Sequence, residues 1–220
     1  MAGEPWQDRI GGWLAGSGCD AWVVQREVVD PATYVELWLK DAGLHGASDY
    51  LVRYDTWLSW FEEQGIEAVG FGWINLRKRP SATGPVQTTQ HLLEWPYDVE
   101  QPVAPAIGDW FAAVDVSVDA GSRLVVRPDV QQETLGQPGA EDPETVVLRQ
   151  QRGLRRARKC DTVEAALVGA CDGELTVGQI LDALAQLLDL DPAQTRETYL
   201  PVVRELLVEG FLEVPRDMEL

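Results

Sequence analysis

The sequence predicts a mixed fold, an α/β region followed by an α+β region, in three consecutive parts. Residues 1–78 predict two strands separated by helices, because runs rich in β-branched and aromatic residues alternate with helical apolar spacing. Residues 79–159 predict a linker and a small antiparallel β region, since turn residues separate short apolar runs. Residues 160–220 predict three helices closed by a short strand, a winged-helix-like domain.

The composition is that of a folded chain with an acidic surface. Of the 220 residues, 45% are hydrophobic and 25% are charged, which are ordinary values for a globular protein. The net charge of −18 disfavours nucleic-acid binding, because a phosphate backbone would be repelled; it favours solubility or a basic partner. The N-terminus lacks the features of a signal peptide, and no run of about 18 apolar residues could span a membrane. We therefore expect a cytoplasmic protein without membrane contact.

Residues that could carry chemistry are few. Cys19, Cys160 and Cys171 are too far apart for a disulfide framework or a zinc site, and no CxxC pair occurs. The two histidines, His45 and His91, have no partner at metal-ligand spacing. The sequence therefore predicts no catalytic, cofactor-binding or metal-binding residue.

Residues 1–78 contain many large apolar side chains that need to be buried. The expected elements of this part, in order, are a helix over 5–15, a strand over 21–29, a helix from Pro31 that is capped by Asp30 and ends at Gly43, a helix over 55–64 and a strand over 68–76. Six of the nine tryptophans fall in the first 60 residues, and a large ring needs burial. A lone two-stranded ribbon is weak, so either the sheet is incomplete within this chain or later strands complete it.

The middle part alternates connectors with short structured pieces. In order, we expect a polar linker over 79–90, an extended piece over 91–96, a helix over 106–114, one or two strands within 123–134, a loop over 136–143 and a strand over 146–151. Pro128 confines one strand to an edge or a bulge. The strands together predict a small antiparallel hairpin.

The last part has clear helix signals. A helix is expected over 162–170, and Thr176 with Gln179 three residues later is a capping-box pattern for the next helix. Asp191 caps a third helix, which Pro201 should kink or split because proline removes an internal hydrogen bond. A short strand over 210–214 follows. From Asp161 onward thirteen acidic residues face three arginines, about −10 net, which favours a protein contact or a structural role over DNA binding.

Two motifs invite functional interpretations that we weigh against simpler ones. Gly70-Phe71-Gly72 lacks the third glycine and the following helix of a nucleotide-binding loop, so a bulge or close packing is favoured. The run Arg149–Lys159 holds six basic residues and no acidic one. It could bind nucleic acid or an acidic partner, but neutralisation of the acidic remainder of the chain is favoured.

Several segments resemble the C-terminal half of a bacterial class I S-adenosylmethionine-dependent methyltransferase, of the group similar to protein-glutamine N5-methyltransferases, with its winged-helix-like extension. The segments that carry the resemblance are 3–9, 20–27, 30–34, 67–73, 138–143, 148–150 and 170–176. The resemblance implies that the first part is the C-terminal portion of a Rossmann-like sheet. In it, 20–29 and 67–77 would form the last, antiparallel pair of strands.

The departures from that family concern its chemistry. The family's glycine-rich loop for the methyl donor and its Asn-Pro-Pro-Tyr motif do not occur here, and the single asparagine, Asn75, is followed by Leu76. The resemblance therefore implies a fragment that is inactive alone and does not bind S-adenosylmethionine by itself. The methyl acceptor would be a protein glutamine or another amide or amine.

Three hypotheses follow from these patterns. The first is this methyltransferase half, with a separate N-terminal half as partner or with self-association through the exposed sheet edge at 67–77. The second is a non-catalytic interaction module that uses the acidic winged-helix-like domain to contact a protein. The third, weaker, is nucleic-acid contact through Arg149–Lys159.

Overall fold

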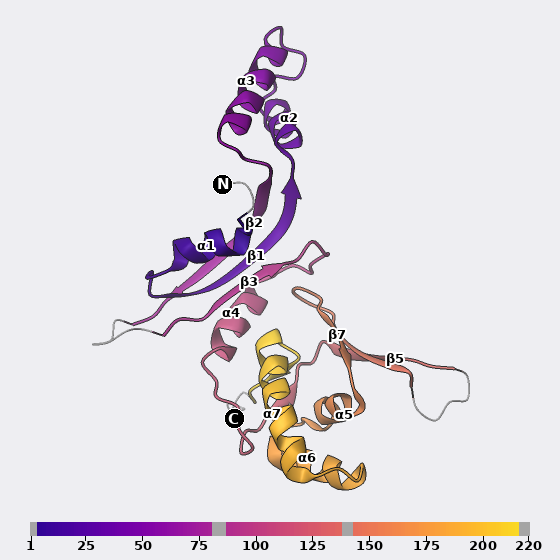
Figure 1. Ribbon diagram of the computed structural model, residues 1–220. Helices are drawn as coiled ribbons and strands as arrows, with labels where there is room; N and C mark the ends of the chain where they lie inside the picture. Colours follow the sequence, from indigo (N-terminus) through magenta and orange to yellow (C-terminus); the bar gives the residue numbers. More distant parts are fainter. Residues whose placement is uncertain (1–3, 81–86, 138–142, 216–220) are drawn as a thin grey trace. The chain divides into compact units, whose positions relative to one another are not determined.

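The computed structural model describes residues 4–80, 87–137 and 143–215. Parts of two expected connectors, 81–86 and 138–142, lie outside the described residues. The described residues form a mixed α/β protein with seven helices and three small sheets (Figure 1). The chain divides into two compact units, Met1–Tyr97 and Asp98–Leu220. Within the described ranges, no helix combines the length and apolar character needed to cross a bilayer.

The elements follow the expected order; the expected extended piece over 91–96 forms a strand of the sheet, and the strand over 157–160 is additional. The N-terminal unit contains α1 (Trp6–Leu14), β1 (Cys19–Val29), α2 (Pro31–Asp41), α3 (Tyr50–Glu63), β2 (Val69–Lys78) and β3 (Gln90–Glu94). The C-terminal unit contains α4 (Ala104–Ala113), β4 (Val125–Val126), β5 (Val130–Leu135), β6 (Thr145–Gln150), β7 (Ala157–Cys160), α5 (Thr162–Ala170), α6 (Val177–Leu187), α7 (Pro192–Glu209) and β8 (Leu212–Glu213). The predicted three-part division of the chain stays a prediction.

The N-terminal sheet has the order β2-β1-β3. The expected antiparallel pair is present as β1 and β2, but β3 then adds to β1 in parallel. At the start of β1, the buried carboxylate of Asp20 accepts bonds from Arg77 at 2.6 Å and from the backbone N–H of Thr89 at 2.9 Å, and it pairs with Arg79. This carboxylate therefore ties the three strands together. The sheet is extended from within the chain, and nothing in it identifies a Rossmann-like sheet, so that expectation is corrected.

The glycine pair in β2 has a packing role. The register between β1 and β2 shifts between Gln25 and Glu27, a β-bulge. A Cβ placed on Gly72, which lies opposite Gln25, would meet the Val24 carbonyl oxygen at 2.1 Å. The strand can therefore approach β1 only with glycine at this position. The expected close packing at Gly70-Phe71-Gly72 is confirmed.

Helices cover the N-terminal sheet only in part. Helix α1 packs on one face through Leu14, against Ala21 and Val23 of β1. Helices α2 and α3 pack on each other around Val35, Leu39 and Phe61. The Asp30 side chain caps α2 as expected, by accepting from the Thr33 N–H at 2.9 Å. Each of these clusters holds three buried residues, and Trp22 and Val24 of β1 are buried outside them.

The C-terminal unit has one large core cluster. Its sheet has the order β5-β6-β7, with both pairs antiparallel, and helices α5, α6 and α7 follow it in the chain (Figure 1). The core joins residues of β6, all three helices and β8, among them Leu148, Leu181, Leu206 and Phe211. The expected hairpin and the three helices closed by a strand are confirmed, and β8 pairs with β4. This arrangement is winged-helix-like.

Local helix signals were largely reliable in this unit. The Thr176–Gln179 capping box is present, and the Asp191 side chain caps α7. Helix α7 nevertheless runs unbroken through Pro201, so the expected split is wrong. Pro201 is exposed, and the packing of Val203, Leu206 and Leu207 in the core holds the helix together across it. The helix ends at Gly210, whose φ of 82° is the left-handed conformation that glycine adopts readily.

Candidate functional site

The candidate site lies where strand β7 faces helix α7. The strand before it, β6, alternates strictly, so Val146, Leu148 and Gln150 are buried and the residues between them are partly exposed. On β7 the residues directly opposite Val146 and Leu148 are Cys160 and Arg158. These two side chains therefore point to the same, helix-covered face of the sheet.

The backbone of β7 has a free outer edge. The Gln150 N–H donates to the Arg156 carbonyl at 2.9 Å, while the Gln151 N–H donates at 3.0 Å to the carbonyl of Asp129, the residue before β5. Because hydrogen-bonded and non-bonded pairs alternate in an antiparallel ladder, Arg156 and Arg158 direct their backbone groups at β6. Ala157 and Lys159 consequently direct their N–H and C=O groups away from the sheet. Among the described residues, no strand pairs with that side of β7.

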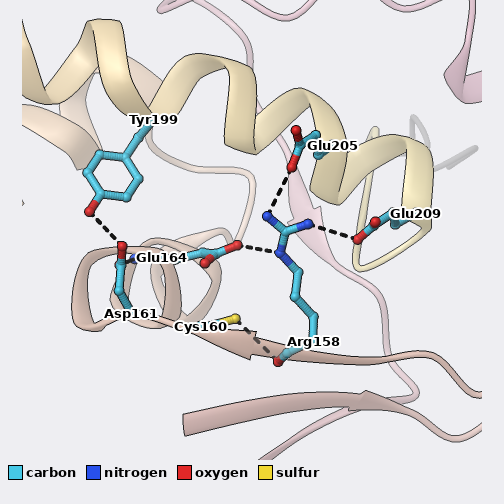
Figure 2. Close-up of polar contacts among 7 residues, drawn as sticks. All are labelled: Arg158, Cys160, Asp161, Glu164, Tyr199, Glu205 and Glu209. Carbon is cyan, nitrogen blue, oxygen red and sulfur yellow. Dashed lines mark hydrogen bonds and ion pairs between the residues drawn. The ribbon is translucent and has the colours of Figure 1, made fainter. Parts of the chain in front are cut away.

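Arg158 organises the contact between this strand and the helices. Figure 2 shows its guanidinium reaching three carboxylates. It donates to Glu164 of α5 at 2.5 Å and, from α7, to Glu209 at 3.0 Å and Glu205 at 3.1 Å. Partial burial opposes the charge of Arg158, but the hydrogen bonds to Glu164 and Glu205 outweigh it and raise the pKa of this guanidinium. The strand and both helices are thus joined through one side chain.

The facing side of α7 is a stripe of residues at helical spacing. Tyr199, Val202, Glu205 and Glu209 are three or four positions apart and so lie on one face. The Tyr199 hydroxyl donates to Asp161, the residue after β7, at 2.8 Å (Figure 2). Burial and this hydrogen bond raise the pKa of Tyr199 to about 12. Helix α7 therefore follows β7 along its length.

Further contacts hold the C-terminal half of α7 in place. The Gln150 amide of β6 donates to the Glu209 carbonyl at 2.8 Å. On another side of the helix, Arg204 donates to the carbonyls of Ala113 at 2.9 Å and Val114 at 3.1 Å, and to that of Val116. A cation at the C-terminal end of α4 also interacts favourably with the helix dipole. Helix α7 is therefore held in place independently of any ligand at β7.

The buried thiols of this unit are poorly suited to nucleophilic chemistry. Burial raises the pKa of Cys160 to about 12 and that of Cys171 to about 11. Both therefore stay protonated at neutral pH, and the thiol is a much weaker nucleophile than the thiolate. Within the described residues, no three His, Cys, Asp or Glu side chains gather as a metal site would require.

The sequence predicted no site residue, yet the basic run Arg149–Lys159 and the acidic C-terminal helices meet here. Arg149 donates to Glu133 at 2.7 Å, and Arg158 is bound by three carboxylates, so the predicted neutralisation is confirmed for these two members of the basic run. Sequence reasoning missed β7, whose first three residues belong to that run. The alternation of Ala157-Arg158-Lys159-Cys160 before the capping residue Asp161 is the signal that could have indicated a strand.

Comparison with known proteins gives a family model, structural matches and one negative result. Residues 107–214 match the family model of DUF7782, a domain of unknown function. The solution NMR structure of the PqqD truncation of Methylobacterium extorquens PqqCD, described as a functional and stand-alone RiPP recognition element, matches with 25% identity and a TM-score of 0.36. The match covers 44% of this chain and 95% of that one. No curated protein matches the chain.

These findings correct the methyltransferase interpretation. The family model that matches is a domain of unknown function, so it gives no support to methyl transfer or to a Rossmann-like domain. Only that resemblance implied S-adenosylmethionine as a cofactor. The expectation that this chain does not bind it by itself stays a prediction.

Proposed function

We propose that residues 98–215 form a non-catalytic module that binds an extended segment of another protein by strand addition at the outer edge of β7. The observation that carries this proposal is the unpaired edge of β7 beside the fixed helix α7. An exposed edge offers backbone donors and acceptors to an incoming strand, and a neighbouring surface supplies contacts for alternate side chains.

The edge of β7 suits this role better than the opposite edge of the sheet. At β5, only Val130 packs against the core, and the side chains from Gln131 to Leu135 are exposed. A strand added beyond Glu133 or Thr134 would gain backbone bonds but few side-chain contacts. A strand added at Lys159 would run beside Tyr199 and Glu205 of α7 as well.

The negative charge of the module favours a basic segment as its partner. The last 60 residues carry about −10 net charge, which attracts cationic ligands over a distance that salt reduces. Within the site, the Glu205 side chain is 60% exposed although it binds Arg158. A lysine or arginine of the incoming segment can therefore reach Glu205 without displacing Arg158 from Glu164.

Selection from a random library tests the proposal. A displayed library of peptides of about ten residues, long enough for one strand, would be selected on the full chain. Affinity of an enriched peptide would then be measured by calorimetry. We expect basic sequences, with affinity that falls as salt rises.

Matched proline variants locate the binding edge. Lys159→Pro removes an outward N–H of β7 without breaking a bond to β6, because proline is tolerated at edge positions. Gln132→Pro does the same at the outward edge of β5. We expect at least a tenfold loss of affinity for the first variant and no change for the second. Equal effects, or selection of no peptide, would overturn the proposal.

A further inference from the structure

A second free edge lies in the N-terminal unit, on β2. The Arg79 N–H donates to the Gly18 carbonyl at 3.0 Å, which sets the alternation along the β1–β2 ladder. Trp73 and Asn75 therefore direct their backbone groups at β1, while Ile74 and Leu76 direct theirs outward. Among the described residues, no strand lies on that side of β2.

This edge carries few of the features that normally prevent strand pairing. Strand β2 is ten residues long and contains no proline, and its charged residues, Arg77 and Lys78, are at its end. Natural edge strands are usually short or interrupted by charge, proline or a bulge on the exposed side. Ile74 and Leu76 are the residues whose backbone groups point outward, and each is 51% exposed. The edge is thus long, apolar and accessible.

The face of the sheet beside this edge is also uncovered. Ile74 lies opposite Val23, on the face where α1 packs. A cavity of about 650 Å³ lies between α1 and β2, and its lining includes Trp6, Trp13 and Ile74. The Trp13 side chain is 67% exposed at this place. The free edge and the apolar cavity therefore form one continuous surface.

We infer that β2 pairs antiparallel with β2 of a second copy of this chain, across a two-fold axis near Ile74. Such an interface is self-complementary, as in most homodimers. A two-fold axis perpendicular to the sheet keeps both α1 helices on one face. They then flank the seam and cover Ile74 and Leu76 from both sides. This inference concerns the N-terminal unit and does not depend on the function proposed for β7.

Charge and shape fit this pairing. With Ile74 at the centre, Lys78 of one copy lies opposite Gly70 of the other, three residues from the exposed Glu67. Around a centre at Ile74, Leu76 of each copy faces Gly72 of the other, and the absence of a side chain there leaves room for it. The pairing therefore adds opposite charges at both ends and apolar contact in the middle.

Sedimentation of the full chain tests the inference. We expect a species of about twice the 24.4 kDa mass of one chain as the concentration rises toward ~100 μM, where a dimer with Kd near 1 μM is almost complete. Ile74→Pro, which removes an outward donor, should weaken self-association at least tenfold. Gln90→Pro, at the outward edge of β3, should leave it unchanged.

A second readout keeps the test decisive if Ile74→Pro does not fold. In the natural chain, the amide protons of Ile74 and Leu76 should exchange more slowly at high concentration than at low concentration. A monomer at ~100 μM overturns the inference. So does a dimer in which these amides exchange at the same rate at both concentrations.

Discussion

The two units of this chain bury their apolar residues very differently. The C-terminal unit gathers eighteen buried residues into one cluster that its sheet and helices share. Among the described residues of the N-terminal unit, eight apolar residues are buried, six of them in two clusters of three, and Trp13, Leu51 and Trp60 are more than half exposed. Burial of apolar area is the main favourable term in folding. The comparison indicates that the C-terminal unit is self-sufficient, whereas the N-terminal unit needs further cover.

Separating the units should produce the largest contrast. A fragment of residues 98–220 is expected to melt cooperatively as a monomer, because its core lies within the fragment. A dilute fragment of residues 1–97 is expected to melt without a sharp transition, because its small clusters bury too little apolar area. Circular dichroism and calorimetry would measure both. Cooperative unfolding of a monomeric 1–97 fragment would contradict the proposed difference between the two units.

Matched phenylalanine truncations compare the two cores directly. Phe211 is fully buried in the C-terminal cluster, so Phe211→Ala should cost about 4 kcal/mol of unfolding free energy. Phe61 is 7% exposed in a three-residue cluster, and Phe61→Ala should cost about 3 kcal/mol or less. Urea denaturation of the full chain measures both values. A larger cost at Phe61 would argue that the N-terminal clusters are better packed than their size indicates.

Removal of the Arg158 side chain should have an intermediate effect. Arg158→Met leaves the buried carboxylate of Glu164 without its cation, and breaking such a pair costs about 3 kcal/mol. The exposed pair of Arg149 and Glu133 is the control, and Arg149→Met should cost less than about 1 kcal/mol. Denaturation midpoints of the two variants give the comparison. Similar costs would mean that Arg158 does not join β7 to the helices.

The smallest expected effect is a dependence of the N-terminal unit on pH. Burial opposes the charge of Asp20, but hydrogen bonds from Thr89, Arg77 and Arg79 outweigh it and hold its pKa below the usual 3.8. The stabilisation is therefore complete above pH 3.8 and is lost as the pH falls through the lower, folded-state pKa.

Tryptophan fluorescence follows this unit, since eight of the nine tryptophans lie in it. Asp20→Asn should reduce the slope of stability against pH below 3.8. An unchanged slope would mean that other carboxylates, and not Asp20, cause the loss of stability at low pH.

Local signals in the sequence predicted most of the elements but not how distant strands meet. Caps at Asp30, Thr176 and Asp191 marked helix starts because the side chain and its N–H partner are three residues apart. The parallel pairing of β3 with β1 joins segments about 70 residues apart, and no local pattern encodes that register. The sequence predicts the start of α3 five residues late, because the Asp49 side chain forms no cap hydrogen bond there.

The candidate site was hidden for a related reason. The basic residues around Arg158 suggested one charged run, although the partners of Arg158 come from α5 and α7, as far as 51 residues away. Net charge alone cannot show which arginines are paired. The free edge of β7 depends on the alternation of hydrogen bonds in a sheet, and this became visible only once its pairing with β6 was known.

The most direct test of the central claim is amide hydrogen exchange at β7 with and without a selected basic peptide. The N–H groups of Ala157 and Lys159 point away from β6, so in the free chain they should exchange quickly. We predict that saturating peptide slows exchange at Lys159 at least tenfold and leaves the outward amides of Gln132 and Thr134 in β5 unchanged. Bound peptide with unprotected amides at β7 would contradict strand addition at this edge.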